Sequence, residues 1–315
     1  MASSKSVVLA ALIANGAIAV MKFGGYLLTQ SPSMLSETYH SISDTGNQVF
    51  LLFGIRYSGR EADQSHPFGY GKAQFFYSFL VAVLLFGIAG WESLKHGYHA
   101  IMHGGEVATG SVTLPVVGAQ IPSVWVNYIV LTGAIIFETW ALYKAYQGLS
   151  KQMVEHEWET LREAFRKTSD VTTLTAFTED SIALGGAGIA MLAIFLSRYT
   201  GNPVYDAIGS VVIGLMLMGF ALALAWENKR LLIGESLPSD EEEQLRSIIR
   251  EWQGVEHIDE FRTVYFGPEE LIVTADVSFD DSLDVEGIDD AITGIEDTII
   301  EREPQVRKVY IEPEV

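Results

Sequence analysis

Six apolar runs dominate the first 230 residues of this 315-residue chain, and each is close to or longer than the roughly 20 residues that a helix needs to cross a bilayer. In lipid, the backbone polar groups must be satisfied within the chain itself, so runs of this length fold as helices. We therefore predict an α-helical polytopic membrane protein with six transmembrane helices in residues 1–230. The runs cover about residues 6–28, 33–57, 73–97, 124–147, 171–197 and 203–227.

The composition of these runs indicates helices packed around a polar interior. Most of them contain glycine, serine, threonine or one acidic residue, which is typical of helices that contact one another in a membrane. The chain has no cysteine, which excludes disulfide bonds and thiolate ligands. Protein ligands for a metal ion must then be histidine, aspartate or glutamate side chains.

Basic residues gather on one side of the predicted bundle, and that side also carries both termini. Cytoplasmic loops of membrane proteins are enriched in lysine and arginine, so both termini are expected in the cytoplasm. Only Arg198 and Lys95 fall on the other side. We expect an integral, multi-pass protein, in the cell (inner) membrane if the source is prokaryotic. The cytoplasmic set comprises Lys5, Arg56, Arg60, Lys72, Lys144, Lys151, Arg162, Arg166, Lys167, Lys229 and Arg230.

The C-terminal part of the chain differs sharply in charge from the membrane part. From Gly234 onward it holds 24 of the 40 acidic and 6 of the 20 basic residues, so it carries −18 of the net charge of −20. We predict a separate cytoplasmic domain over residues 231–315. Its acidity fits a solvated surface, and the alternative is a field that concentrates divalent cations. With His257 as the only histidine there, a regulatory metal site is not expected.

Periodicity in this domain predicts the order helix, strand, strand, helix, strand. Ser239 and Glu242 are spaced as a capping box at the start of the first helix. Apolar residues alternate from Leu271 to Phe279, as in a half-buried strand, and a last strand runs over residues 306–311. This order fits a small α+β sandwich with helices on one face of a sheet. The second helix is marked by Ile288, Ile292, Ile295 and Ile299.

His40 and Asp44 lie four residues apart inside the second apolar run. On a helix this spacing puts both side chains on one face. An imidazole nitrogen and a carboxylate oxygen held in this way form half of a tetrahedral site for zinc or a similar ion. A polar pair in hydrocarbon costs free energy, so its usual role is in an ion pathway. Glu37 lies one turn before His40, and Asn47 three residues after Asp44.

Glu179 and Asp180 interrupt the fifth apolar run. Adjacent residues point about 100° apart on a helix, so only one of the two can face the His40–Asp44 pair squarely. We predict that this pair of acids completes a metal site with the second helix. The alternative is that the acids lie in water-filled vestibules or bind Lys22 of the first run, with no metal.

A weaker candidate lies in the loop after the second run. Asp63 and His66 could bind a cation at the cytoplasmic surface, although an exposed pair of this kind usually binds none.

Several segments together resemble the cation diffusion facilitator family. Residues 33–48 (SMLSETYHSISDTGNQ) resemble its second transmembrane helix, residues 66–72 (HPFGYGK) its following loop, and Glu179-Asp180 with the glycines after them its fifth helix. Residues 201–206 (GNPVYD) and 231–236 (LLIGES) are most similar to the branch that contains zinc transporter nine. The similarity runs nearly end to end.

The resemblance implies a ferredoxin-like cytoplasmic domain, a homodimer and proton-coupled efflux of a divalent metal. In the family, two residues of helix two and two of helix five surround the ion. His40 and Asp44 match the first two positions and Asp180 the fourth, but the third is Ala176. Glu179, Asn47 or water would complete the shell. The loop site also departs from the family, because Tyr70 stands where many relatives carry histidine, and the paired cytoplasmic metal sites of some members are missing.

The expected function is therefore proton-coupled antiport of Zn²⁺ by alternating access. Metal binding releases protons, because histidine ligates only when neutral and carboxylates only when ionised. Alternatives are a Mn²⁺, Fe²⁺ or Co²⁺ exporter, a metal-selective channel and a non-transporting metal-responsive scaffold. A membrane metalloenzyme is not expected, because such enzymes usually need several histidine-rich clusters and only one histidine lies within the membrane. We expect no resident cofactor and no nucleic-acid partner.

Overall fold

The structure is a computed structural model that describes residues 4–104, 110–113, 120–155, 160–161, 164, 171–268 and 270–314. Of the basic residues expected on the cytoplasmic side, Arg162, Arg166 and Lys167 lie outside these ranges. Contacts divide the described residues into two compact units, Met1–Val49 with Val81–Ala223 and Phe50–Leu80 with Leu224–Val315.

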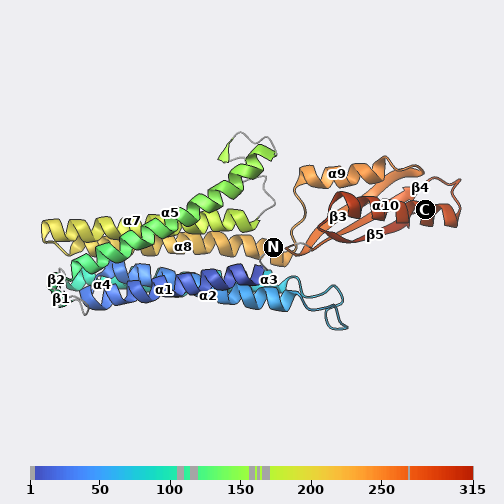
Figure 1. The fold of residues 1–315 in the computed structure, drawn as a ribbon. Coiled ribbons are helices and arrows are strands. Elements are labelled where there is room, and N and C mark those ends of the chain that lie inside the picture. The colour runs from blue at the N-terminus through green and yellow to red at the C-terminus, as the bar shows by residue number, and fades with distance from the viewer. Residues whose placement is uncertain are drawn as a thin grey trace. The chain divides into compact units, whose positions relative to one another are not determined.

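Long helices occupy all six of the predicted apolar runs (Figure 1). They begin and end within a few residues of the expected bounds, except that the third, fourth and sixth runs extend further at their C-terminal ends. The helices are α1 (Ser4–Thr29), α2 (Pro32–Ser58), α3 (Ala73–Leu84) continued by η1 (Leu85–Gly90) and α4 (Trp91–His103), α5 (Val124–Glu155), α7 (Val171–Thr200) and α8 (Val204–Ile233).

Among the described residues, five helical segments are long and apolar enough to cross a membrane. α2 is not one of them, since its N-terminal half is rich in serine, threonine and ionisable residues. The five segments are Leu12–Thr29, Ala73–His103, Val124–Val154, Phe177–Thr200 and Val204–Ile233.

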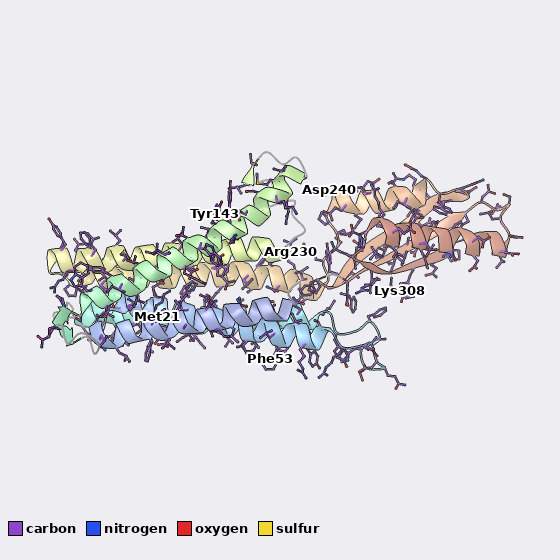
Figure 2. The ribbon with its side chains drawn as sticks, viewed as in Figure 1. Met21, Phe53, Tyr143, Arg230, Asp240 and Lys308 are labelled. Carbon is purple, nitrogen blue, oxygen red and sulfur yellow. The ribbon has the colours of Figure 1, made fainter. Side chains whose placement is uncertain are left out.

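Large hydrophobic side chains are exposed on the helices of the first part of the chain, including α2, as expected of helices that face lipid. Met21 of α1, Phe53 of α2 and Tyr143 of α5 are 53%, 56% and 56% exposed (Figure 2). The strands β1 (Ser111–Thr113) and β2 (Gln120–Pro122) pair as a short antiparallel hairpin between α4 and α5.

Small residues bring α4 and α8 into close contact. A Cβ atom on Gly97 would lie 2.8 Å from the Ala207 carbonyl oxygen, and one on Gly214 would lie 2.7 Å from the Leu94 nitrogen. These are backbone atoms, so no side-chain movement could relieve the clash. Packing of this kind is common between membrane helices, where close approach replaces the hydrophobic driving force.

The C-terminal domain has the predicted order of elements. They are α9 (Ser239–Arg250), β3 (Val255–Gly267), β4 (Glu270–Phe279), α10 (Val285–Arg302) and β5 (Val306–Glu314). β4 is the central strand, antiparallel to β3 and parallel to β5. The parallel pairing requires the crossover that α10 supplies. The predicted alternation in β4 is confirmed, since every second residue from Leu271 to Phe279 is buried.

The core of this domain lies between the sheet and the two helices. Leu271, Val273 and Val277 of β4 pack with Ile249 of α9 and Ile295 of α10, and each of these side chains is fully buried. An apolar core of this kind stabilises a domain whose surface is strongly acidic.

The predicted capping box at α9 is wrong. The N-cap residue is Pro238, and among the described residues no side chain caps the helix. The Glu242 carboxylate instead accepts a hydrogen bond from the Thr263 hydroxyl of β3, at 3.1 Å. A tertiary contact has therefore replaced the local one.

Candidate metal centre

The second helix presents His40 as a buried group without hydrogen bonds. The side chain is 2% exposed, and neither Nδ1 nor Nε2 has a hydrogen-bond partner among the described residues. Nε2 lies 3.6 Å from Asp44 Oδ2, which is close enough for electrostatic attraction but too long for a hydrogen bond. An unpaired buried imidazole costs free energy, and a bound cation would supply the missing partner.

The fifth predicted span, α7, brings its acids to the same region. Asn47 Nδ2 of α2 donates a hydrogen bond to Glu179 Oε1 at 3.3 Å. Glu179 and Asp180 are both half-buried. The side chain of Ala176 lies outside the described part of the chain.

These side chains do not converge into one cluster in the state described. Across the described residues, no group of three or more histidine, aspartate or glutamate side chains is close enough to hold a metal ion. His40 and Asp44 lie together, and Asn47 and Glu179 lie together. Coordination by both helices at once therefore requires these side chains to come closer together than they lie here.

Lys22 binds Glu37, and not Glu179 or Asp180, which were the alternative partners in the sequence analysis. Its Nζ lies 2.8 Å from Glu37 Oε2, and both side chains are fully buried. The second carboxylate oxygen of Glu37, Oε1, has no partner in the described structure. It lies against α7, only 2.5 Å from where a Cβ on Gly186 would be. The sequence singles out Lys22 as the only lysine within the first apolar run, but not Glu37 as its partner.

Buried serines and one aspartate join α2 to α4 and α8 near the N-terminal end of α2; we call this set the serine seam. Ser33 N donates to Asp206 Oδ1 at 3.1 Å, and Ser33 Oγ donates to the Asp206 carbonyl at 2.7 Å. Ser36 and Ser210 share a hydrogen bond of 2.8 Å, and Ser210 also donates to the Ser93 carbonyl at 2.9 Å. All five residues are buried.

In the loop after α2, Asp63 accepts three hydrogen bonds from the loop itself. Its Oδ1 accepts from the backbone nitrogens of Ser65 and His66, both at 2.8 Å, and its Oδ2 accepts from the Tyr70 hydroxyl at 2.7 Å. The Tyr70 hydrogen bond, followed by the backbone ones, holds the pKa of this carboxyl below its usual value. His66 Nδ1 is 3.8 Å from Asp63 Oδ1, so the two predicted auxiliary residues are neighbours. The hydrogen bonds to Asp63 stabilise a turn of the loop.

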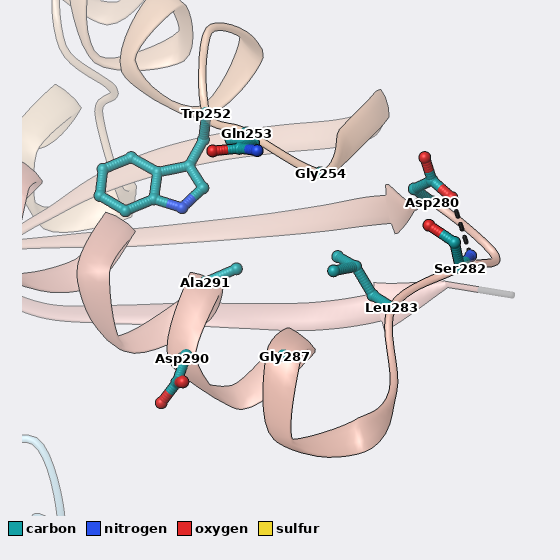
Figure 3. Close-up of a pocket in the computed structure, with 9 residues that line it drawn as sticks. All are labelled: Trp252, Gln253, Gly254, Asp280, Ser282, Leu283, Gly287, Asp290 and Ala291. Carbon is teal, nitrogen blue, oxygen red and sulfur yellow. Dashed lines mark hydrogen bonds between the residues drawn. The ribbon is translucent and has the colours of Figure 1, made fainter.

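A cavity of about 380 Å³ opens in the C-terminal domain, between the end of α9, the end of β4 and the start of α10. Trp252, Leu283 and Ala291 form its apolar walls (Figure 3). Asp280 lies at its rim, where Oδ1 accepts a hydrogen bond from Ser282 N at 2.8 Å. Among its described lining residues there is no histidine, and Asp280 and Asp290 are its only carboxylates. The described residues offer no group of three or more histidine, aspartate or glutamate side chains here that could hold a metal ion.

Comparison with known families covers both parts of the chain. The family described as "Cation efflux transmembrane domain" matches residues 8–233. The family described as "Cation efflux protein, cytoplasmic domain" matches residues 237–314.

Individual relatives are similar at low identity. The chain is 27% identical over 283 residues to "Metal tolerance protein C4" of Arabidopsis thaliana, covering 90% of this chain and 59% of that protein. It is 28% identical over 274 residues to "Proton-coupled zinc antiporter SLC30A9, mitochondrial" of Mus musculus, covering 87% and 46%. It is 24% identical over 272 residues to "Cation-efflux pump FieF" of Yersinia enterocolitica, covering 85% and 79%. The chain thus spans only about half the length of the first two relatives.

One solved structure, a nickel form of a variant of the "MamM CTD", is 14% identical with a TM-score of 0.21. The match covers 23% of this chain and 96% of that one, and a likeness this slight carries no argument.

Proposed function

Because this chain belongs to the cation efflux family, we propose that it exports a divalent metal cation, with Zn²⁺ as its cargo, in exchange for protons. Family membership makes it a membrane transporter and not an enzyme. In the proposal, His40, Asp44 and Asp180 bind the cation, and Glu179 assists, with Asn47 holding Glu179 toward α2.

The burial of His40 is the observation that carries this proposal. Its imidazole is 2% exposed, lacks any hydrogen bond within the described residues and has Asp44 3.6 Å away. A structural histidine in such a place would be hydrogen-bonded. An imidazole nitrogen and a carboxylate are donor types that zinc binds.

The finer architecture is part of the same proposal. α2 would be a sixth span that presents its polar face to the bundle, with residues 1–230 as the membrane domain and 231–315 as a ferredoxin-like cytoplasmic domain. Both termini would be cytoplasmic, in the cell (inner) membrane if the source is prokaryotic. The cytoplasmic domain would hold two copies together as a homodimer, in line with its family match.

Proton coupling follows from the chemistry of the ligands. A cation that reaches His40 from the cytoplasm requires the neutral imidazole and ionised carboxylates, so its binding releases protons. When the site opens to the outside, protons compete for the same atoms and displace the cation. The mouse relative is named a proton-coupled zinc antiporter, which supports the proposal that protons are exchanged for the metal.

The ligand set bears on which metal is carried. Alanine at 176 leaves one fewer carboxylate or imidazole than the family pattern, which weakens the preference for zinc over Mn²⁺, Fe²⁺ or Co²⁺. Uptake should therefore be measured across a panel of divalent ions.

The deciding experiment is transport into proteoliposomes with the pH gradient set independently of the metal gradient. Zn²⁺ flux should follow the pH gradient, and His40→Asn or Asp44→Asn should lower it at least about tenfold, as expected for lost ligands. His257→Asn is the matched control, because that histidine is exposed in the C-terminal domain.

Three results would contradict the proposal in different ways. Full flux in His40→Asn would exclude this site. Flux that ignores the pH gradient at rates far above those of a carrier would indicate a channel. Metal binding without flux would indicate a scaffold.

A further inference from the structure

The Lys22–Glu37 pair has no role in the site proposed above, yet it is the most deeply buried charged contact described. The ammonium and the carboxylate are 2.8 Å apart and both side chains are fully buried. Ionisable groups are rare in membrane interiors, because taking them out of water costs free energy. Where they occur, they usually take part in function.

The pair lies at the boundary between two differently buried parts of α2. Within residues 31–41, every residue except Tyr39 is buried, whereas residues 43–50 are all half-buried. Glu37 belongs to the first part and lies one turn before His40, while Asp44 belongs to the second. A route to His40 from the Asp44 side is therefore more open than one from the N-terminal end of α2.

Several contacts close the N-terminal side of His40. Lys22 links Glu37 to α1, and the Glu37 carboxylate lies against the backbone of α7 at Gly186. Next along α2 toward its N-terminus, the serine seam joins Ser36 to Ser210 of α8. The ion pair is the first of these closures beyond His40.

We infer that the Lys22–Glu37 ion pair is the gate that closes the metal site toward the N-terminal end of α2, and that the cargo's own charge opens it. A divalent cation beside His40 repels the Lys22 ammonium and attracts Glu37 Oε1, which has no partner of its own among the described residues. The inference rests on the proposed function for the identity of the cargo. The proposed function also gives the side on which the gate lies, since the N-terminal end of α2 faces outward when both termini are cytoplasmic.

The absence of cysteine from the chain makes the gate directly measurable, because an introduced thiol is the sole one. Ser210→Cys puts it in the serine seam, beyond the gate, at a fully buried position. The full-length protein in lipid nanodiscs is treated with a charged methanethiosulfonate reagent, and the labelled fraction is followed by mass. Ser111→Cys, at an exposed position, is the control for reagent activity.

Without metal, Ser210→Cys should label slowly. Adding Lys22→Met and Glu37→Gln removes the ion pair and should raise the rate of labelling at position 210 at least about tenfold. The reversed pair, Lys22→Glu with Glu37→Lys, restores the attraction and should return the rate toward the slow value. Glu92→Gln with Lys95→Met removes an exposed pair of α4 and should change nothing. Should the first double variant not fold, Lys22→Gln with Glu37→Gln removes the same charges and lets the two amides hydrogen-bond.

A folded neutral double variant that labels as slowly as the parent would overturn the inference. Zn²⁺ should also speed labelling of the parent, but not of the same protein carrying Asp44→Asn. If Zn²⁺ has no effect while the neutral pair still labels fast, the gate stands and the proposed cargo is what fails.

Discussion

At the residue scale, polar side chains along α2 differ in whether the fold satisfies them. The hydroxyls of Ser36 and Thr38 bind carbonyl oxygens four residues earlier in the chain, at 3.2 and 2.8 Å. His40 and one oxygen of Glu37 have no such partner in the described structure. On α2 the serine and threonine hydroxyls donate to the helix backbone, whereas the His40 imidazole and the Glu37 Oε1 atom bond no group of the described structure. In the proposed function, the unsatisfied atoms of His40 and Glu37 are the ones that a cation or a proton would meet.

Tyr70→Phe tests the other residue-scale contact, in the loop after α2. Removing the hydroxyl deletes the largest cause of the lowered Asp63 pKa, so this pKa should rise toward its ordinary value. A carboxyl whose pKa is depressed on folding stabilises the fold above its unfolded pKa, and this contribution disappears as the pH falls through the folded value. The variant should therefore lose loop structure at a higher pH than the parent.

The measurement is the carboxyl ¹³C shift of Asp63 during a pH titration of the full chain. Tyr310→Phe, in the C-terminal domain, is the control. An Asp63 titration midpoint that stays where it was would mean that the hydroxyl does not hold the carboxylate in solution.

At the element scale, the crossing of α4 and α8 is set by glycines. Gly214→Ala would bring a methyl group to 2.7 Å from the Leu94 nitrogen and 2.9 Å from the Gly90 oxygen, so the helices must separate. We expect a loss of about 1–3 kcal/mol of stability, the usual effect of overpacking. Thermal unfolding of the purified protein measures it.

Gly219→Ala on the same helix is the matched control, since a Cβ there meets nothing within 4 Å. It should be neutral or stabilising by up to about 1 kcal/mol, because alanine favours a helix over glycine. Equal melting temperatures for the two variants would contradict this account of the crossing.

The elements themselves could largely be predicted, because periodicity and length report on burial. The helical runs and the alternation in β4 follow directly from the apolar pattern. Contacts between elements could not be predicted in the same way. Neither the Lys22–Glu37 pair nor the hydrogen bond from Thr263 to Glu242 has a local signature, because its members lie 15 and 21 residues apart.

The sequence predicted both the residues of the candidate site and their convergence on one cation. Pattern reasoning selected His40, Asp44, Glu179 and Asp180 from their rarity in apolar runs. It could not say that the two helices would hold these groups as separate pairs, His40 with Asp44 and Glu179 with Asn47. Such an arrangement depends on the relative rotation of α2 and α7, which side-chain packing decides.

At the scale of the whole molecule, the dominant feature is the uneven charge. Residues from Gly234 onward carry −18 of the net −20, and the family match of this domain fits a homodimer. Two such domains repel one another when they associate, and salt screens that repulsion.

We therefore expect the dimer to strengthen as salt rises. Light scattering of the full-length protein in detergent should give a larger dimer fraction at about 0.5 M salt than at about 0.01 M. At the lower concentration the screening length is about 30 Å, so charges repel one another across the whole interface. A dimer fraction that falls with salt would mean that attractive ion pairs dominate the contact.

The π-helical turn of η1, Leu85–Gly90, has a practical consequence for anyone who scans the third membrane segment. A π turn inserts an extra residue into the helical count, which rotates all later positions by about 100° relative to an ideal wheel. Substitution or spin-label series drawn on a single wheel from Ala73 to His103 would therefore assign lipid-facing and buried positions wrongly after Gly90. Two wheels, with the second restarted at Trp91, give the correct faces.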